Sequence, residues 1–164
     1  MSRWPRSSTR ARGSLRSIRR TTRKAGKHCR EARDGDTLAQ GAMLLAPGDH
    51  HLRVARCPAG RMVHIDQAAP VHFCRPAADP LFESAAAAFG PRVVGVVLTG
   101  IGRDGCEGSA RIVAAGGRVI VQDEATSVVW GMPGAVAMAG YAEAVKPLRD
   151  LSSLALKMMN GDGA

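Results

Sequence analysis

The sequence has few features typical of a membrane protein or of a secreted, disulfide-bonded one. No run of apolar residues approaches the roughly 20 that a membrane-spanning helix needs. The four cysteines show no Cys-x-x-Cys spacing and no neighbouring ligand pattern; they are Cys29, Cys57, Cys74 and Cys106. We therefore expect free thiols in a reducing cytoplasm, no metal and no cofactor.

Acidic residues are missing from the first 30 positions, which contain eleven Lys or Arg. Residues 31–164 contain twelve basic and fourteen acidic residues, so the net charge of +9 originates in the N-terminal segment. Because this segment also has few apolar residues, we expect residues 1–29 to form a disordered basic arm. A single domain is predicted at 30–164, long enough to bury a moderate core.

Three interpretations of the arm remain open. The first is a polybasic tail that binds RNA, DNA or lipid through charge, and the second is a targeting segment. In the third, which we favour because the composition changes abruptly near residue 30, the arm is foreign to the domain. The chain would then begin late or be translated out of frame before that point.

Apolar β-branched runs alternate with helical periodicity along the rest of the chain. Strands are predicted at 42–46, 52–54, 62–65, 93–98, 118–121 and 142–145, the second and third forming a hairpin-like excursion. Helices are predicted from Pro80 to Phe89, with Asp79 as the N-cap, and at 105–115, 132–139 and 148–159. This alternation predicts an α/β fold with a doubly wound, mostly parallel sheet and helices on both faces.

A glycine-rich turn with one carboxylate, Asp104, follows the predicted strand at 93–98. Residues 100–105 match G-x-G-x-x-G, and Asp123 follows at the separation of a ribose-binding acid, so a dinucleotide site is one alternative. Against it, Asp104 would place a negative charge beside the pyrophosphate. A second role for Asp104 is the N-cap of the helix at 105–115.

The amino-acid sequence of the whole segment is more specific than this motif. LTGIGRDG, AGG and QDEATSVVWGMPGAVAMAG, with EARDGDTL, LLAPGDHHL and CRPAADPLF upstream, closely resemble the catalytic domain of CheB-type chemotaxis protein-glutamate methylesterases. The resemblance covers about residues 30–159 and implies hydrolysis of glutamyl methyl esters on methyl-accepting chemoreceptors, possibly with deamidation of receptor glutamines. It also implies a Ser-His-Asp triad in which Asp104 is the acid that orients the histidine. The implied active-site turn contains Thr99, Gly100, Ile101, Gly102 and Gly105.

The triad partners implied by the resemblance are not found. A serine-rich turn and a Gln-His-Met-Pro type motif are expected upstream of Glu31, where the sequence is instead rich in arginine. We therefore expect the sheet to lack its first strand or strands and the chain, as an incomplete copy, to be inactive. The alternatives are a non-catalytic receptor-binding remnant and a nucleic-acid binder that uses residues 1–29.

Two further residues match the family pattern. His51 follows a Pro-Gly-Asp turn, and we expect it to have a turn or surface role rather than a chemical one. Arg75, in CRPAAD, is expected to hold a loop or contact an acidic receptor, or alternatively to pair with a nearby carboxylate on the surface.

Overall fold

The computed structural model describes residues 28–58 and 60–160. Almost all of the predicted basic arm, residues 1–29, lies outside these ranges. The disorder and the nucleic-acid binding predicted for the arm therefore concern residues outside the described part of the chain. The strands are β1 (His28–Glu31), β2 (Ala42–Leu45), β3 (His51–Cys57), β4 (Gly60–Asp66), β5 (Val94–Val97), β6 (Arg118–Gln122) and β7 (Ala144–Lys146). The helices are α2 (Ala78–Phe89), α3 (Cys106–Ala114), α4 (Met132–Met138) and α5 (Leu148–Asn160), with a short 3-10 helix η1 (Gly90–Arg92).

The pairing of the strands confirms a mostly parallel α/β architecture. β5, β6 and β7 form a parallel sheet in that order, and β1 pairs in parallel with β2. β3 and β4 form an antiparallel hairpin, which confirms the predicted excursion, with both strands longer than expected. We did not predict β1, which begins two residues before the expected domain boundary.

Helices cover both faces of the sheet β5–β6–β7, as predicted. Because side chains alternate along a strand, Val119 and Val121 of β6 join a buried cluster with Ile112 of α3 and Val136 of α4. Ile120, between them in sequence, packs with Leu151 of α5 on the opposite face. The two layers of helices therefore follow directly from the alternating pattern of β6.

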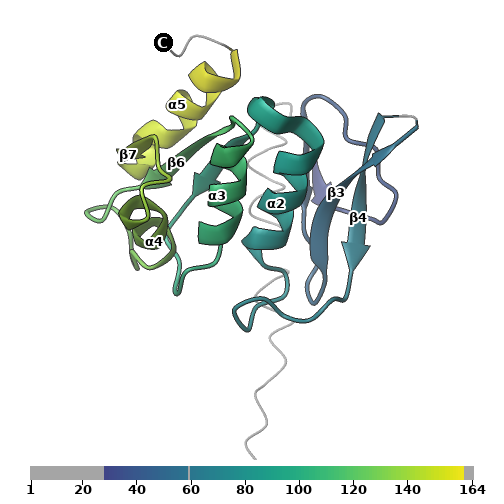
Figure 1. The fold of residues 1–164 in the computed structure, drawn as a ribbon, viewed down its shortest axis with the longest axis horizontal. Coiled ribbons are helices and arrows are strands. Elements are labelled where there is room, and N and C mark those ends of the chain that lie inside the picture. Colours follow the sequence, from purple (N-terminus) through teal and green to yellow (C-terminus); the bar gives the residue numbers. More distant parts are fainter. Residues whose placement is uncertain (1–27, 59, 161–164) are drawn as a thin grey trace, which may run out of the picture.

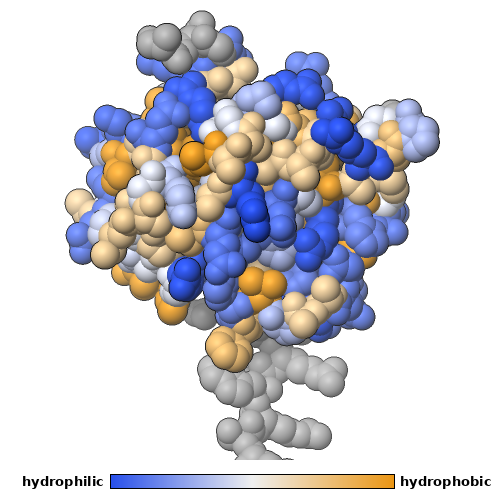
Figure 2. All heavy atoms as spheres, viewed as in Figure 1, coloured by the Kyte–Doolittle hydropathy of each residue, from blue (hydrophilic) through white to orange (hydrophobic). Residues whose placement is uncertain are grey.

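Helix α2 lies between α3 and the hairpin β3–β4 (Figure 1). A third buried cluster, formed by Ala32, Leu52 and Val63, joins the hairpin to the neighbourhood of β1 and β2. On the face in view, hydrophilic residues are concentrated over α2 and α3, and hydrophobic residues form small separate groups (Figure 2). These helices thus turn their apolar sides toward the interior.

Three ion pairs join segments that are far apart in the sequence. Arg75 Nη2 lies 2.7 Å from Asp49 Oδ1, Arg53 Nε lies 2.9 Å from Asp66 Oδ2, and Arg118 Nε donates to Glu143 Oε2 over 2.7 Å. Hydrogen bonds from Arg75 and Arg118 lower the pKa of Asp49 and Glu143 respectively. The pKa of Asp66 is lowered first by the amide of Ala68 and then by Arg53.

These lowered pKa values predict loss of stability in acid. A carboxyl whose pKa is lower in the folded than in the unfolded chain stabilises the fold above its unfolded pKa, about 4, and this contribution disappears as pH falls through the folded pKa. We expect the urea midpoint of unfolding to be similar at pH 7 and pH 5.5 and to fall steeply below pH 4. Asp49→Asn should make this decline shallower, and a midpoint that does not change between pH 5.5 and pH 3 would contradict the prediction.

Candidate functional site

Two loops meet at the carboxyl edge of the parallel sheet. One follows β5 and contains the predicted turn with Thr99, Gly100, Ile101, Gly102 and Gly105, and the other follows β6. The amide of Gly100 donates to the carbonyl of Val129 over 3.1 Å, and the amide of Met132 donates to the carbonyl of Gly100 over 2.9 Å. Thr99 Oγ1 also donates to the Val129 carbonyl and accepts from its amide. The loops therefore form one unit at the edge where α/β sheets place their sites.

Gly131 allows the close approach of these loops. A Cβ atom at this position would lie 2.7 Å from the carbonyl oxygen of Gly100 and 2.9 Å from the amide nitrogen of Gly102. Because both contacts are with backbone, no side-chain rotation relieves them. The turn around Gly131 therefore acts as a support for the turn after β5.

Gln122, at the end of β6, connects the loops after β5 and β6 to the sheet through its buried side chain. Its fully buried side chain accepts a hydrogen bond from the Thr99 amide over 2.9 Å and donates one to the Thr126 carbonyl over 2.7 Å. Sequence reasoning missed this residue, although a polar residue closing the run Arg118–Gln122 was a usable signal.

Asp104 is buried, and both of its carboxylate oxygens accept backbone hydrogen bonds. Oδ2 accepts from the amide of Ala78 over 2.7 Å and Oδ1 from the amide of Asp79 over 3.0 Å. These amides open α2, whose N-terminus has a partial positive charge that favours a carboxylate.

The prediction that Asp104 caps its own helix is wrong. α3 has Gly105 as its N-cap residue, in a left-handed conformation with φ of 86° and with no side-chain capping bond. Asp104 instead caps α2, which packs beside α3. Asp79 is not the N-cap of α2 either, because that position is held by Ala77; Asp79 is the second residue of the helix, and its own amide bonds Asp104.

Asp79, in the first turn of α2, bonds the first turn of α3. Its Oδ1 accepts from the amide of Gly108 over 2.6 Å, and its Oδ2 accepts from His72 Nε2 over 3.2 Å. Burial raises the pKa of Asp79, and the nearby Asp104 adds to this effect. Asp104, which lies just before α3, thus bonds the first turn of α2, and Asp79 of α2 bonds the first turn of α3. His72 joins the same hydrogen-bond network through Asp79.

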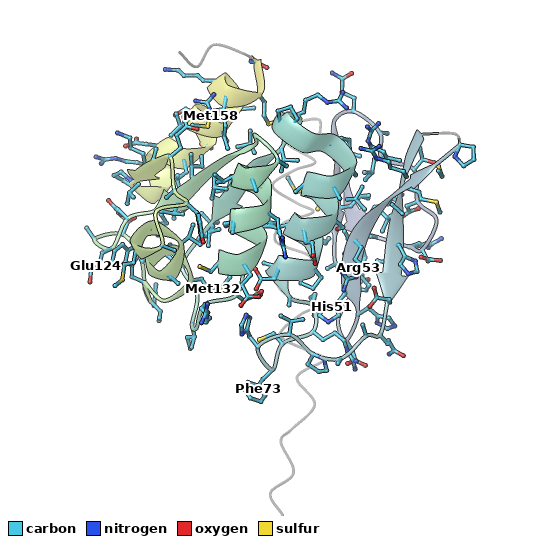
Figure 3. The ribbon with its side chains drawn as sticks, viewed as in Figure 1. His51, Arg53, Phe73, Glu124, Met132 and Met158 are labelled. Atoms are coloured by element: carbon cyan, nitrogen blue, oxygen red, sulfur yellow. The ribbon has the colours of Figure 1, made fainter. Side chains whose placement is uncertain are left out.

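His51 is a buried structural residue rather than a surface one, contrary to our expectation. Its side chain is 0% exposed, Nε2 donates to the Ala69 carbonyl over 3.1 Å, and Nδ1 accepts from the Ala77 amide over 3.3 Å. A ring that donates through one nitrogen and accepts through the other is neutral. Figure 3 shows His51 at the foot of the hairpin, beside the loop that leads to α2.

Arg75 holds this loop, as predicted for one of its roles. Its guanidinium donates to the carbonyls of Gln67 and Ala68, each over 3.0 Å, and pairs with Asp49. The predicted alternative, a surface ion pair, is therefore present as well.

The remaining candidates do not converge on Asp104. Among residues 28–58 and 60–160, no serine or histidine side chain bonds to its carboxylate. Asp123, which the dinucleotide interpretation needs for a ribose, accepts from the amide of Thr126 over 3.0 Å within its own loop. In the same part of the chain the cysteines are free, no cluster of His, Cys, Asp and Glu could hold a metal, and no helix is long and apolar enough to cross a bilayer.

Comparison with known proteins finds relatives that match most of the chain. The chain is 58% identical over 120 residues to a protein-glutamate methylesterase/protein-glutamine glutaminase of Caulobacter vibrioides, covering 73% of this chain and 35% of the relative. It is 53% identical over 129 residues to one of Nocardioides sp., covering 79% and 35%. The chain thus spans about a third of the length of these curated relatives.

The crystal structure of the CheB methylesterase catalytic domain of Thermotoga maritima superposes with a TM-score of 0.77 at 33% identity, covering 79% of this chain and 68% of that one. A family model described as CheB methylesterase matches residues 13–154, so the match starts within the segment that we expected to be foreign. These matches, which cover most of the sequence and its fold, show that the chain belongs to the CheB methylesterase family.

Proposed function

We propose that the surface around Asp104 recognises methylated or amidated glutamate side chains of methyl-accepting chemoreceptors in the cytoplasm, and that Asp104 is the acid of a hydrolytic triad. The observation that carries this proposal is the buried Asp104 carboxylate, held at the carboxyl edge of β5 by two amides of α2. Each carboxylate oxygen has two acceptor sites and the amides use one of each, so a histidine N–H still finds an acceptor.

The chemistry follows from that arrangement. The carboxylate keeps a histidine in the tautomer that accepts the proton of a serine, and it stabilises the imidazolium that forms. The serine oxygen attacks the ester carbonyl, the carbon–oxygen bond to methoxide breaks, and methanol leaves with the proton returned by the histidine. Water then hydrolyses the acyl-enzyme; with a glutamine side chain the leaving group is ammonia.

We further propose that the chain as written binds this substrate without turning it over. Asp104 is the only triad member recognisable in the sequence, and loss of a triad serine or histidine costs on the order of a millionfold in kcat in a comparable hydrolase. We therefore propose a non-catalytic receptor-binding protein.

The test uses the full chain and a receptor cytoplasmic fragment that carries radiolabelled methyl esters. We expect measurable binding but release of labelled methanol at the rate of the enzyme-free control. Methanol release at a rate typical of the family, abolished by Asp104→Ala, would overturn the inactivity and support the triad role. Failure to bind or hydrolyse the fragment would overturn the receptor function.

A further inference from the structure

The segment Val71–Cys74, in the loop before α2, has an unusual tight turn. The amide of Cys74 donates to the carbonyl of Val71 over 2.9 Å, and the amide of Val71 donates back to the Cys74 carbonyl over 3.1 Å. The two central residues have positive φ, 49° at His72 and 62° at Phe73. A type I′ turn requires this conformation and normally uses Asn and Gly, because side chains larger than these cost about 1–2 kcal/mol per residue there.

Contacts with the surrounding structure fix this turn. His72 donates to Asp79 of α2, whose amide in turn bonds Asp104. Arg75, directly after the turn, donates to the carbonyls of Gln67 and Ala68 before it. His51 bonds Ala69 before the turn and Ala77 after it. The turn is therefore attached to the same network as the candidate triad acid rather than suspended on a free loop.

Phe73 is presented by this turn to solvent. Phe73 is fully exposed, and Figure 3 shows its ring pointing away from the rest of the molecule. Ile101, three residues before Asp104, is 84% exposed in the turn after β5, and this turn is joined to the Phe73 turn through the Asp104–Asp79–His72 hydrogen bonds. Aromatic side chains are typical anchors of protein interfaces, and a fixed backbone turn lowers the entropy lost when such a side chain becomes buried.

The polar side chains on either side of Phe73 in the turn and after it already have partners. Arg75 is bonded to Asp49, and His72 is bonded to Asp79. Within the described residues 71–75, no charged side chain is left unpaired, so the tip of the loop offers a partner an apolar contact. A side chain that matches it is aliphatic or aromatic.

We propose that Phe73, assisted by Ile101, anchors the polypeptide substrate by packing against an apolar side chain next to the modified glutamate. This inference rests on the proposed function, since it assumes that a protein segment approaches Asp104. It extends that function by assigning the partner's chemistry: a segment with an apolar residue flanking the ester or amide, rather than a free glutamate ester.

The experiment measures the dissociation constant of the full chain for a receptor cytoplasmic fragment with glutamine at its modification sites, by titration calorimetry. We expect Phe73→Ser to weaken binding by about tenfold or more, and Ile101→Ser to weaken it less. Leu156→Ser is the matched control, because Leu156 is 59% exposed on α5 and should not change the constant. Phe73→Leu should restore most of the affinity.

The outcomes separate the two proposals. Equal affinity of the wild type and Phe73→Ser would overturn the role of Phe73 and leave receptor binding intact. An equal loss in Leu156→Ser would also overturn it, because the effect would not be specific to the turn. No binding by the wild-type chain would overturn the proposed function together with this inference. Thermal unfolding of each variant shows that it is folded, which is expected for exposed positions.

Discussion

Asp104→Ala should lower the free energy of unfolding by about 2–3 kcal/mol, a large effect for a residue in a turn. The substitution removes both acceptors of the amides of Ala78 and Asp79 at the start of α2. Each buried amide left without a partner costs about 1–3 kcal/mol, and water entering the vacated space recovers part of this. The favourable interaction of the carboxylate with the N-terminus of α2 is also lost.

Urea unfolding followed by circular dichroism measures this effect. Asp150→Ala is the matched control, since Asp150 also lies in the first turn of a helix but has an exposed side chain, and we expect a change within about 0.5 kcal/mol. The loss of unfolding free energy in Asp104→Asn should lie between those of Asp104→Ala and Asp150→Ala. The asparagine amide oxygen accepts one of the two hydrogen bonds, whereas its NH2 group cannot accept the other. An Asp104→Ala chain as stable as the wild type would show that these amides do not depend on the carboxylate.

The carboxylate proposed to orient a histidine also holds the helix beside it. A loss of binding or activity in Asp104→Ala would therefore combine two effects, and the Asp104→Asn variant, compared at equal fractions folded, separates them.

Gly131→Ala should destabilise the chain by about 2–3 kcal/mol or more, although it adds one methyl group. The φ of Gly131 is −74°, which alanine adopts without strain. The cost is steric: the methyl group would lie 2.7 Å from the carbonyl oxygen of Gly100, so the loop after β6 would have to move away from the turn after β5. The hydrogen bonds of Gly100 to Val129 and Met132 would lengthen with it.

The control for this substitution is Gly48→Ala. A Cβ atom at Gly48 has nothing within 4 Å, so this substitution should change the unfolding free energy by less than about 0.5 kcal/mol. Hydrogen exchange of the amides of Gly100 and Met132 should be faster in Gly131→Ala than in the wild type. Unchanged stability together with unchanged exchange would contradict the proposed support of the turn by Gly131.

Much of the architecture could be predicted from local sequence patterns. The β-branched runs at β5 and β6 and the helical periodicity of α5 predicted these elements to within two residues. β1 was missed because its four residues, HCRE, contain no apolar run, and its pairing with β2 places it in the fold.

The candidate site was only partly predictable. The motif after β5 identified Asp104 as the residue of interest, but not its hydrogen-bond partners. Ala78 and Asp79 lie 26 and 25 positions upstream, and no spacing rule joins them to Asp104. Gln122 and the buried His51 were missed or misassigned for the same reason, since their partners come from other segments.

Local sequence patterns are enough to predict the α/β class, the order of most helices and strands, and the position of the carboxylate at the edge of the sheet. These properties depend on periods of 2 and 3.6 residues and on turn residues, all of which act over a few neighbouring positions. Three properties depend on the folded structure: Asp104 caps α2 rather than α3, Asp79 and His72 extend its hydrogen-bond network, and Phe73 is exposed on a turn joined to that network. Those outcomes depend on which helix ends and loops are packed against one another, and this is settled by burial across the whole fold.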